Sequence, residues 1–383
     1  MSLIDRSDYI LRIKSAHRIH AVTALLGPRQ CGKTTLARQY IKEQNEPVHY
    51  FDLEDPEHLN QLTEPKLALA PLKGLIVIDE IQKIPNLFPV LRVLVDEDNA
   101  ERKFLILGSA SRTLIKQASE SLAGRIEYIE LTPFDLSEVK DAEKLWLRGG
   151  FPKAYLSENN TDSMRWREAY IQTFLEQDIP NLGIQIAPSM LRRFWMMISH
   201  YHGQLCNFSE LGRSLGVSHN TARHYLDILT ATFMIRTLQP WYENVGKRQI
   251  KTPKIYFRDS GIYHALLKQP EKETLLMTPH VGASWEGFAL EQVIRFHQAR
   301  PESCFFWATQ GHAEVDLLIL EGSRKIAYEF KYTSTPKITK SMRIAMEDLQ
   351  LDKLTIITPG EKSYPLNEHI VVSSLKNVYK DCC

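Results

Sequence analysis

Short, continuous apolar runs alternate with helix-like stretches through the first 135 residues. Buried parallel strands read as continuous apolar runs, whereas strands with one solvated face alternate between apolar and polar residues. The pattern therefore predicts an α/β domain built on a parallel sheet over residues 1–135. The expected strands are Val22–Leu26, His49–Leu53, Leu75–Asp79, Phe104–Leu107 and Ile126–Leu131.

The pattern changes after residue 135. Residues 136–203 look helical, with amphipathic helices expected at Met164–Gln177 and Ser189–His202, and predict a helical lid or linker. Residues 204–268 contain two short helices around the sequence LGVS, followed by stretches that could pair as a hairpin. This segment predicts a winged helix-turn-helix.

Residues 269–383 predict a compact α/β domain of their own. The whole chain is therefore expected to be α/β, with a sheet domain at each end and helical segments between them. The elements expected in the last domain are the helices Ser284–Gln298 and Ile338–Leu349 and the strands Cys304–Thr309, Val315–Leu320, Lys325–Tyr332 and Leu354–Thr358.

Composition narrows the class of protein without choosing a function. The chain has 383 residues, of which 43% are hydrophobic and 24% charged, as in ordinary globular proteins. No stretch approaches the roughly 20 apolar residues of a membrane helix, and the first residues lack the apolar core of a secretory signal. We therefore expect a cytoplasmic location without membrane partners. The five cysteines have no spacing suited to zinc.

Charge is distributed unevenly along a chain whose formal net charge is only +1. Residues 201–258 contain eight Lys or Arg and three Asp or Glu, so this stretch carries +5 and the remainder carries −4. A uniformly basic nucleic-acid coat is excluded. The local excess instead predicts a polyanion contact in the middle of the chain.

The sequence GPRQCGKTT satisfies the phosphate-loop pattern G-x-x-x-x-G-K-[ST] between an apolar strand and a helix-forming stretch. Its glycines let the backbone wrap phosphates, Lys33 would reach the β- and γ-phosphates, and the Thr34 hydroxyl would bind Mg²⁺. We therefore expect ATP and Mg²⁺ here. The predicted nucleotide-binding residues are Gly27, Pro28, Arg29, Gln30, Cys31, Gly32, Lys33, Thr34 and Thr35.

A second acidic signal follows in LIVIDEIQKIP, where four apolar residues end in Asp79 and Glu80. Carboxylates at the carboxyl edge of a buried parallel strand lie where ligands bind in such sheets. Asp79 is predicted to serve the magnesium ion, usually through water. Glu80 is predicted to orient or deprotonate the attacking water.

Two further residues have open alternatives. Ser109 is the first hydroxyl after the apolar strand in KFLILGSAS, and could sense the γ-phosphate or simply cap a helix. Arg125, in SLAGR, could project toward a neighbouring subunit's γ-phosphate as an arginine finger, or could be an ordinary surface arginine. If Arg125 acts on a neighbour, the active ATPase is a homo-oligomer.

The motifs GPRQCGKTT, LIVIDEIQKIP, ILGSASRTL, SLAGR and RGGFP occur in this order. Together they resemble the AAA-superfamily ATPases of bacteria and archaea that carry a C-terminal domain of unknown function. The resemblance covers essentially the whole chain and implies the fold and ATP binding more than any cellular role. Cys31 departs from the family's motifs at a variable loop position.

The basic middle of the chain has helix-turn-helix spacing from Asn207 to Leu238. Ser209 is expected to cap the first helix, Gly216 to end it and Ser218 to cap the second. DNA contact, mostly to the backbone, is one interpretation; a spacer or protein-binding module is the other. The predicted DNA contacts are His219, Asn220 and Arg223 on the second helix and Lys247, Arg248 and Lys251 in the wing.

The C-terminal segment places acidic residues and a lysine in the order helix, strand, strand. This E…D…ExK spacing resembles the PD-(D/E)XK nuclease core, which implies a second Mg²⁺ or Mn²⁺ held by paired carboxylates. The alternative is an ordinary hairpin with charges on its solvent face. The predicted residues are Asp316, Glu329 and Lys331, with either Glu286 or Glu291 as the helix carboxylate.

Two classes of function remain open from sequence alone. The chain could be an ATP-driven enzyme that handles DNA and has nuclease-like chemistry at its C-terminal end. It could instead be an ATP-dependent switch whose C-terminal half binds a protein client and cuts nothing. Stimulation of ATP hydrolysis by DNA, with a steep salt dependence, would separate the two.

Overall fold

The computed structural model describes residues 4–97, 101–110, 122–242, 250–311 and 313–378. The chain forms two compact units. The first unit comprises Met1–Pro133, Gln177–Gln185 and Ala231–Met234, and the second comprises Phe134–Glu176, Ile186–Thr230 and Ile235–Cys383. The second unit therefore contains most of the residues of the three segments that were expected after residue 135.

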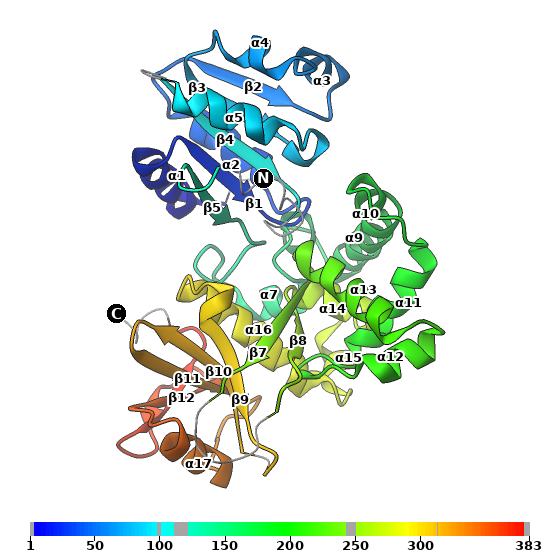
Figure 1. The fold of residues 1–383 in the computed structure, drawn as a ribbon. Coiled ribbons are helices and arrows are strands. Elements are labelled where there is room, and N and C mark those ends of the chain that lie inside the picture. Colours follow the sequence, from blue (N-terminus) through cyan, green and yellow to red (C-terminus); the bar gives the residue numbers. More distant parts are fainter. Residues whose placement is uncertain (1–3, 98–100, 111–121, 243–249, 312, 379–383) are drawn as a thin grey trace. The chain divides into compact units, whose positions relative to one another are not determined.

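The described residues of the first unit form a five-stranded parallel sheet in the order β2-β3-β4-β1-β5 (Figure 1). Each strand pairs in parallel with its neighbours. This confirms the α/β fold with a parallel sheet. The strands are β1 (Val22–Leu26), β2 (Val48–Asp52), β3 (Gly74–Asp79), β4 (Arg102–Gly108) and β5 (Ile126–Glu130).

Helices cover both faces of this sheet. On one face α1 (Ser7–Ile19) and α2 (Lys33–Lys42) pack on strand residues such as Leu25. On the other face α5 (Leu87–Asp96) packs on the alternate residues, such as Ala24. Because successive side chains point to opposite faces, all positions of β1 and β3 and the last five of β4 are buried, which explains their continuous apolar runs. Shorter helices are α3 (Pro56–Gln61), α4 (Pro65–Leu69), α10 (Ile179–Asn181) and a 3-10 turn at Ile81–Lys83.

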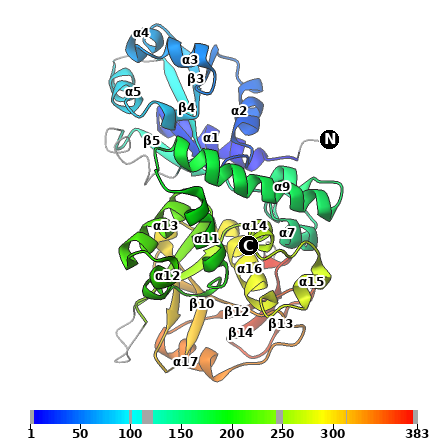
Figure 2. The ribbon, with the colours of Figure 1, turned by 90° about the vertical axis from the view of Figure 1, so that its right-hand side faces the viewer.

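The second unit combines a group of helices with a large mixed sheet. Figure 2 shows α11, α12 and α13 as neighbouring helices, and the expected amphipathic helices correspond to α9 and α11. No helix in the described ranges is long and apolar enough to cross a membrane. The helices are α7 (Ala142–Arg148), α8 (Pro152–Tyr155), α9 (Asn160–Thr173), α11 (Pro188–Ser199), α12 (Phe208–Leu215), α13 (His219–Ala231), α14 (Ser260–Leu266), α15 (Lys272–Leu276), α16 (Val281–Phe296) and α17 (Lys340–Asp348).

Nine strands of the described second unit share one sheet, in the order β13-β14-β12-β11-β10-β9-β7-β8-β6. The hairpin β7–β8, expected as the wing, is therefore continuous with the C-terminal strands, because β7 pairs in parallel with β9. The strands are β6 (Gln204–Leu205), β7 (Ile235–Pro240), β8 (Lys254–Phe257), β9 (Cys304–Ala308), β10 (Glu314–Glu321), β11 (Arg324–Phe330), β12 (Leu354–Thr358), β13 (Tyr364–Pro365) and β14 (Ile370–Ser374).

Candidate functional site

The predicted phosphate loop connects β1 to α2 and is built around two glycines. A Cβ atom on Gly27 would lie 2.1 Å from the carbonyl oxygen of Leu131, so only glycine fits there. Gly32 has φ +105°, a left-handed conformation that glycine adopts without strain, and it directly precedes α2. The tight turn thus delivers the chain to a helix N-terminus, whose N–H groups and dipole favour anions.

The lysine of the motif is buried inside the loop. Lys33 is only 5% exposed, and its Nζ donates hydrogen bonds to the carbonyl oxygens of Gly27 at 2.9 Å and Pro28 at 3.0 Å. Arg6 supports the loop from α1's start by donating to the Cys31 carbonyl at 3.0 Å. The Cys31 side chain is fully buried, and burial raises the pKa of its thiol. Cys31 therefore has a packing role inside the loop and is not a reactive group.

The middle of the loop is held by ion pairs that the sequence did not predict. Arg29 pairs with Asp178, which belongs to the Gln177–Gln185 segment of the same unit, and with Glu54 at 2.7 Å. Asp178 lies 149 residues further along the chain, so no local pattern indicates this contact. The predicted residues Gln30 and Thr35 are exposed.

The end of β3 meets the start of α2 through a hydrogen-bonded carboxylate. Asp79 Oδ2 accepts from the Thr34 hydroxyl at 2.7 Å and from the Tyr50 hydroxyl at 2.8 Å, while Oδ1 accepts from the Glu80 backbone N–H at 3.0 Å. Burial raises the pKa of Asp79, although the two hydroxyls act in the opposite direction. Tyr50 was not predicted from the sequence. Its position on β2, the strand that pairs with β3, is the feature that could have indicated a contact with Asp79.

Glu80 has a restrained side chain on an unusual backbone. Its φ of +57° is a left-handed conformation that non-glycine residues rarely adopt and that clusters at functional sites. Glu80 Oε2 accepts a hydrogen bond from the Gln82 side chain and one from Ser109 Oγ at 3.3 Å. Gln82 also donates to Ser109 Oγ at 3.0 Å. Gln82, which sequence reasoning missed, links the ends of β3 and β4.

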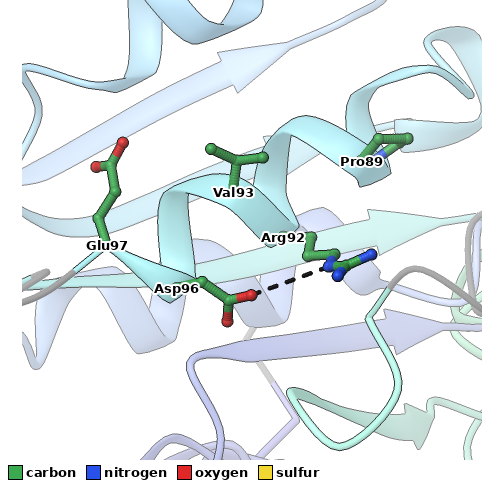
Figure 3. A pocket seen from close by; sticks show the side chains of 5 residues that line it. All are labelled: Pro89, Arg92, Val93, Asp96 and Glu97. Atoms are coloured by element: carbon green, nitrogen blue, oxygen red, sulfur yellow. Dashed lines mark ion pairs between the residues drawn. The ribbon is translucent and has the colours of Figure 1, made fainter.

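Arg125 lies apart from the loop residues in a surface ion pair. Its guanidinium contacts the Asp96 carboxylate through two bonds of 2.5 Å and 2.9 Å. A surface pocket of about 430 Å³ beside Asp96 is lined by Pro89, Arg92, Val93, Asp96 and Glu97 (Figure 3). None of the predicted nucleotide-binding residues lines this pocket. The arginine-finger role of Arg125 stays a prediction.

The helix-turn-helix spacing corresponds to α12 and α13. Gly216, with φ +74°, ends α12, and Ser218 Oγ accepts from the Thr221 N–H at 3.0 Å at the start of α13. The expected cap of α12 was wrong by two residues: Asn207, not Ser209, accepts from the Glu210 N–H. Asparagine and serine are about equally good N-cap residues, so residue type alone could not decide between Asn207 and Ser209.

The predicted DNA-contact side chains on α13, namely His219, Asn220 and Arg223, are all exposed. Lys251 in the hairpin is exposed as well. Lys247 and Arg248 lie outside the described residues.

The predicted C-terminal acidic residues gather around two lysines. Lys331 Nζ lies 2.8 Å from Glu329 Oε2 and 3.4 Å from Asp316 Oδ2, while the Phe330 N–H donates to Asp316 Oδ2 at 3.0 Å. Burial raises the pKa of Glu329 well above its usual value, and the nearby Asp316 carboxylate adds to the shift. The two carboxylates and the lysine of the E…D…ExK pattern are therefore adjacent.

The helix carboxylate of this cluster is Glu286, which the β8 residues Tyr256 and Lys254 contact. The Tyr256 hydroxyl donates to Glu286 Oε1 at 2.7 Å, and Lys254 Nζ lies 3.9 Å from the same oxygen. Burial raises the pKa of Glu286 to about 7, with a further contribution from Asp316. Lys254 was not predicted. Among the described residues, no three His, Cys, Asp or Glu side chains are grouped so that they could hold a metal ion.

The alternative helix carboxylate, Glu291, is wrong. Five residues along a helix turn the side-chain direction by about 140°, so Glu291 leaves α16 on a different face from Glu286. It is 2% exposed and pairs with Arg236. Arg258 and Arg295 lie within 3.7 Å and 3.8 Å of its carboxylate. Burial alone would raise the pKa of Glu291, but the three guanidinium groups lower it to about 2.

Three family models match successive parts of this chain. The model described as an AAA domain matches residues 20–140. A domain of unknown function (DUF8612) matches residues 139–273, and another (DUF4143) matches residues 281–378. With the parallel sheet and phosphate loop, the first match shows an AAA-type P-loop ATPase domain, a fold that implies a nucleotide and typically Mg²⁺.

Two mycobacterial proteins are similar over nearly the whole chain. The uncharacterised proteins Rv2008c of Mycobacterium tuberculosis and Mb2031c of Mycobacterium bovis are each 48% identical over 371 residues, covering 96% of this chain and 83% of the relative. This chain belongs to the same family. The uncharacterised protein MJ1544 of Methanocaldococcus jannaschii is 22% identical, covering 90% of this chain and 83% of the relative.

Among solved structures, the Walker-type ATPase PABY2304 of Pyrococcus abyssi aligns with 69% of this chain and 96% of its own. The TM-score is 0.48 and the sequence identity is 14%. RuvB of Thermotoga maritima, a Holliday junction branch migration motor, aligns with 61% of this chain and 90% of its own, with a TM-score of 0.32 and 20% identity.

The arginine cluster around Glu291 leads to a prediction of stability in the second unit. Replacing Glu291 with Gln keeps the side chain's size but leaves the guanidinium groups of buried Arg236 and partly buried Arg258 and Arg295 without their carboxylate, which should lower the free energy of unfolding by about 3 kcal/mol at pH 7. Because the folded pKa lies near 2 and the ordinary value is 4.5, this difference should be complete above pH 4.5 and disappear as pH falls toward 2.

Urea unfolding followed by tryptophan fluorescence measures this difference. Glu347→Gln on α17 is the matched control, because Glu347 is exposed and its replacement should change stability by less than about 0.5 kcal/mol. A Glu291→Gln protein as stable as this control at pH 7 would show that the cluster does not stabilise the unit.

Proposed function

We propose that this protein binds ATP with Mg²⁺ in the loop 27–35, hydrolyses it with Glu80, and uses the cycle to act on DNA. The observation that carries the ATPase part is the 2.7 Å hydrogen bond between Thr34 and Asp79. It joins the end of the phosphate loop to the end of a central strand. A hydroxyl and a carboxylate are oxygen ligands that suit Mg²⁺, so the residues present fit the ion.

The loop also fits the nucleotide's phosphates. Gly27 leaves no room for a Cβ atom beside the Leu131 carbonyl, so the loop can take its tight course only with glycine at this position. Lys33 already stands at the loop, bonded to carbonyl oxygens of Gly27 and Pro28, and can exchange these neutral acceptors for charged phosphate oxygens. When bound, MgATP supplies a γ-phosphoryl group whose developing charge the metal neutralises during transfer to water.

Glu80 is the residue that we propose handles the attacking water. Its carboxylate can orient the water and take its proton, since it stands directly after Asp79 at the end of β3. Ser109 and Gln82 both bond Glu80 Oε2, so they would hold the carboxylate in one orientation. In this interpretation Ser109 positions the catalytic group and does not need to touch the γ-phosphate itself.

The second part of the proposal concerns DNA. Four arginines, Arg192, Arg193, Arg213 and Arg223, are exposed on the consecutive helices α11, α12 and α13. Arg193 reaches the carbonyl oxygen of Ser214 at 2.7 Å, which ties α11 to the end of α12. Guanidinium groups spread over neighbouring helices suit phosphate contacts, whereas Arg223 alone is too little for reading bases. We therefore propose backbone contact without strong sequence preference.

Two variants of the first unit test the ATPase proposal. Lys33→Ala should lose ATP binding by at least about 100-fold, because it removes the cation for the phosphates. Glu80→Gln should bind ATP normally and hydrolyse it at least about 100-fold more slowly, since it removes only help in the transition state. Equilibrium binding of labelled ATP and steady-state phosphate release measure the two effects.

The control for both variants is Lys42→Ala, because Lys42 is exposed at the far end of α2. It should bind and hydrolyse ATP like wild type. Unchanged ATP affinity in a folded Lys33→Ala protein would contradict the proposed binding site.

DNA contact is tested by the ATPase rate in the presence of duplex DNA at several salt concentrations. We expect DNA to stimulate the rate, and the DNA concentration for half-maximal stimulation to rise steeply with salt. Arg223→Ala should raise that concentration about fivefold or more and make the salt dependence shallower by one charge. Arg343→Ala on α17 is the matched exposed control and should change neither value.

No stimulation at any salt concentration would contradict the DNA proposal. The ATP-dependent switch would then take its place if a protein partner bound in a nucleotide-dependent way.

A further inference from the structure

The C-terminal carboxylates lie around Lys254, a residue of the β7–β8 hairpin that follows α12 and α13. Lys254 lies on β8, at least 32 residues before the first carboxylate of the cluster. Its ammonium bonds Glu314 and lies 3.9 Å from both Glu286 Oε1 and Asp316 Oδ1. One cation thus faces three carboxylates that arrive from α16 and β10.

Lys254 is buried in this position and packs against an aromatic ring. The residue is only 6% exposed, and its ammonium stands 5.5 Å from the centroid of the Phe306 ring, a favourable cation–π distance. Because β8 pairs with both β6 and β7, the backbone that carries Lys254 is fixed within the sheet. The lysine is therefore a built part of the cluster.

The remaining carboxylate has its own cation. Lys331 lies 2.8 Å from Glu329 and 3.4 Å from Asp316, on the opposite oxygen from the one that faces Lys254. Asp316, the central ligand that a nuclease-like site would need, is consequently approached by an ammonium at each oxygen. Tyr256 and the backbone N–H of Phe330 add neutral donors to Glu286 and Asp316.

A divalent ion does not fit this arrangement. Metal–oxygen bonds to Asp316 and Glu286 are about 2 Å long, and both oxygens lie 3.9 Å from the Lys254 ammonium, so an ion bound by them would stand within roughly 6 Å of that ammonium. Two positive centres this close repel strongly in a site shielded from water. The charges at this cluster therefore do not suit the Mg²⁺ or Mn²⁺ ion that the nuclease resemblance implies.

We infer that Lys254 takes the place of the divalent metal, so that the C-terminal domain keeps the nuclease-like carboxylates as a cluster whose charge is partly offset by its own lysines. The hairpin and the C-terminal strands then form one sheet whose polar centre is closed by a lysine from the hairpin. Recognition, not metal-dependent cleavage, is the chemistry open to this domain. This inference does not depend on ATP hydrolysis by the first unit.

Binding of Mn²⁺ to the full chain without nucleotide tests the inference. Calorimetry and the electron paramagnetic resonance signal of free Mn²⁺ should give the same isotherm for wild type and Asp316→Asn, because the cluster takes no metal in either. Lys254→Met, which keeps most of the side chain's length and removes its charge, should gain one Mn²⁺ site that binds at least about tenfold more tightly than any site at this cluster in wild type. Adding Asp316→Asn to Lys254→Met should abolish that site. Lys353→Met, at an exposed lysine, should behave like wild type.

Two results would overturn the inference. The first is a Mn²⁺ site in wild type that Asp316→Asn weakens tenfold, and this comparison decides the question even if Lys254→Met does not fold. The second is a Lys254→Met protein with a native circular dichroism spectrum that gains no Mn²⁺ site. Any Mn²⁺ that binds at the phosphate loop is common to all these variants and cancels between them.

Discussion

The candidate nucleotide site of the first unit is organised around one side-chain hydrogen bond, from the Thr34 hydroxyl to the Asp79 carboxylate. The two residues are 45 positions apart and belong to elements that meet at the carboxyl edge of the parallel sheet, where ligands bind in open α/β folds. The bond fixes where the loop ends relative to β3. Tyr50, which bonds the same carboxylate oxygen, keeps Asp79 in place, and Glu80 follows on a backbone with positive φ.

The pairing of Arg29 with Asp178 extends this site along the chain. Asp178 belongs to a short segment of the first unit, Gln177–Gln185, that continues directly from α9 and into α11. The middle of the phosphate loop is therefore ion-paired with a segment that is covalently joined to helices of the second unit. Burial raises the pKa of Asp178, so losing its arginine partner would leave a poorly hydrated carboxylate in the first unit.

Motif spacing predicted the phosphate loop because its chemistry is local. Gly27, Lys33 and Thr34 lie within eight residues, and the close approach of Leu131 shows why the first position is glycine. The parallel sheet was equally predictable, since strands buried on both faces must be apolar throughout. Helix phase alone shows that Glu286 and Glu291 lie on different faces, because the two residues point about 140° apart, but the Arg236 pairing of Glu291 decides between them.

Other contacts could not be predicted, since they depend on how distant segments join. From sequence alone, Lys254 is one of several basic residues in a predicted hairpin. The pairing of β7 with β9 places β8, and with it Lys254, in the same sheet as the C-terminal strands. From sequence alone, Asp178 is an ordinary carboxylate in a helical stretch. The structure shows that its segment belongs to the first unit. In both residues the sequence shows a charge, but only the fold shows which opposite charge it meets.

We propose that Thr34 and Asp79 form the magnesium end of the ATP site, and the Mg²⁺ dependence of nucleotide affinity tests this role. A fluorescent ATP analogue would be titrated with and without Mg²⁺ against wild type, Thr34→Ser and Thr34→Val. We expect Mg²⁺ to tighten binding by about tenfold or more, roughly 1.4 kcal/mol, in wild type and Thr34→Ser. Thr34→Val should lose this gain while keeping its Mg²⁺-free affinity. Full Mg²⁺ enhancement in Thr34→Val would contradict the account.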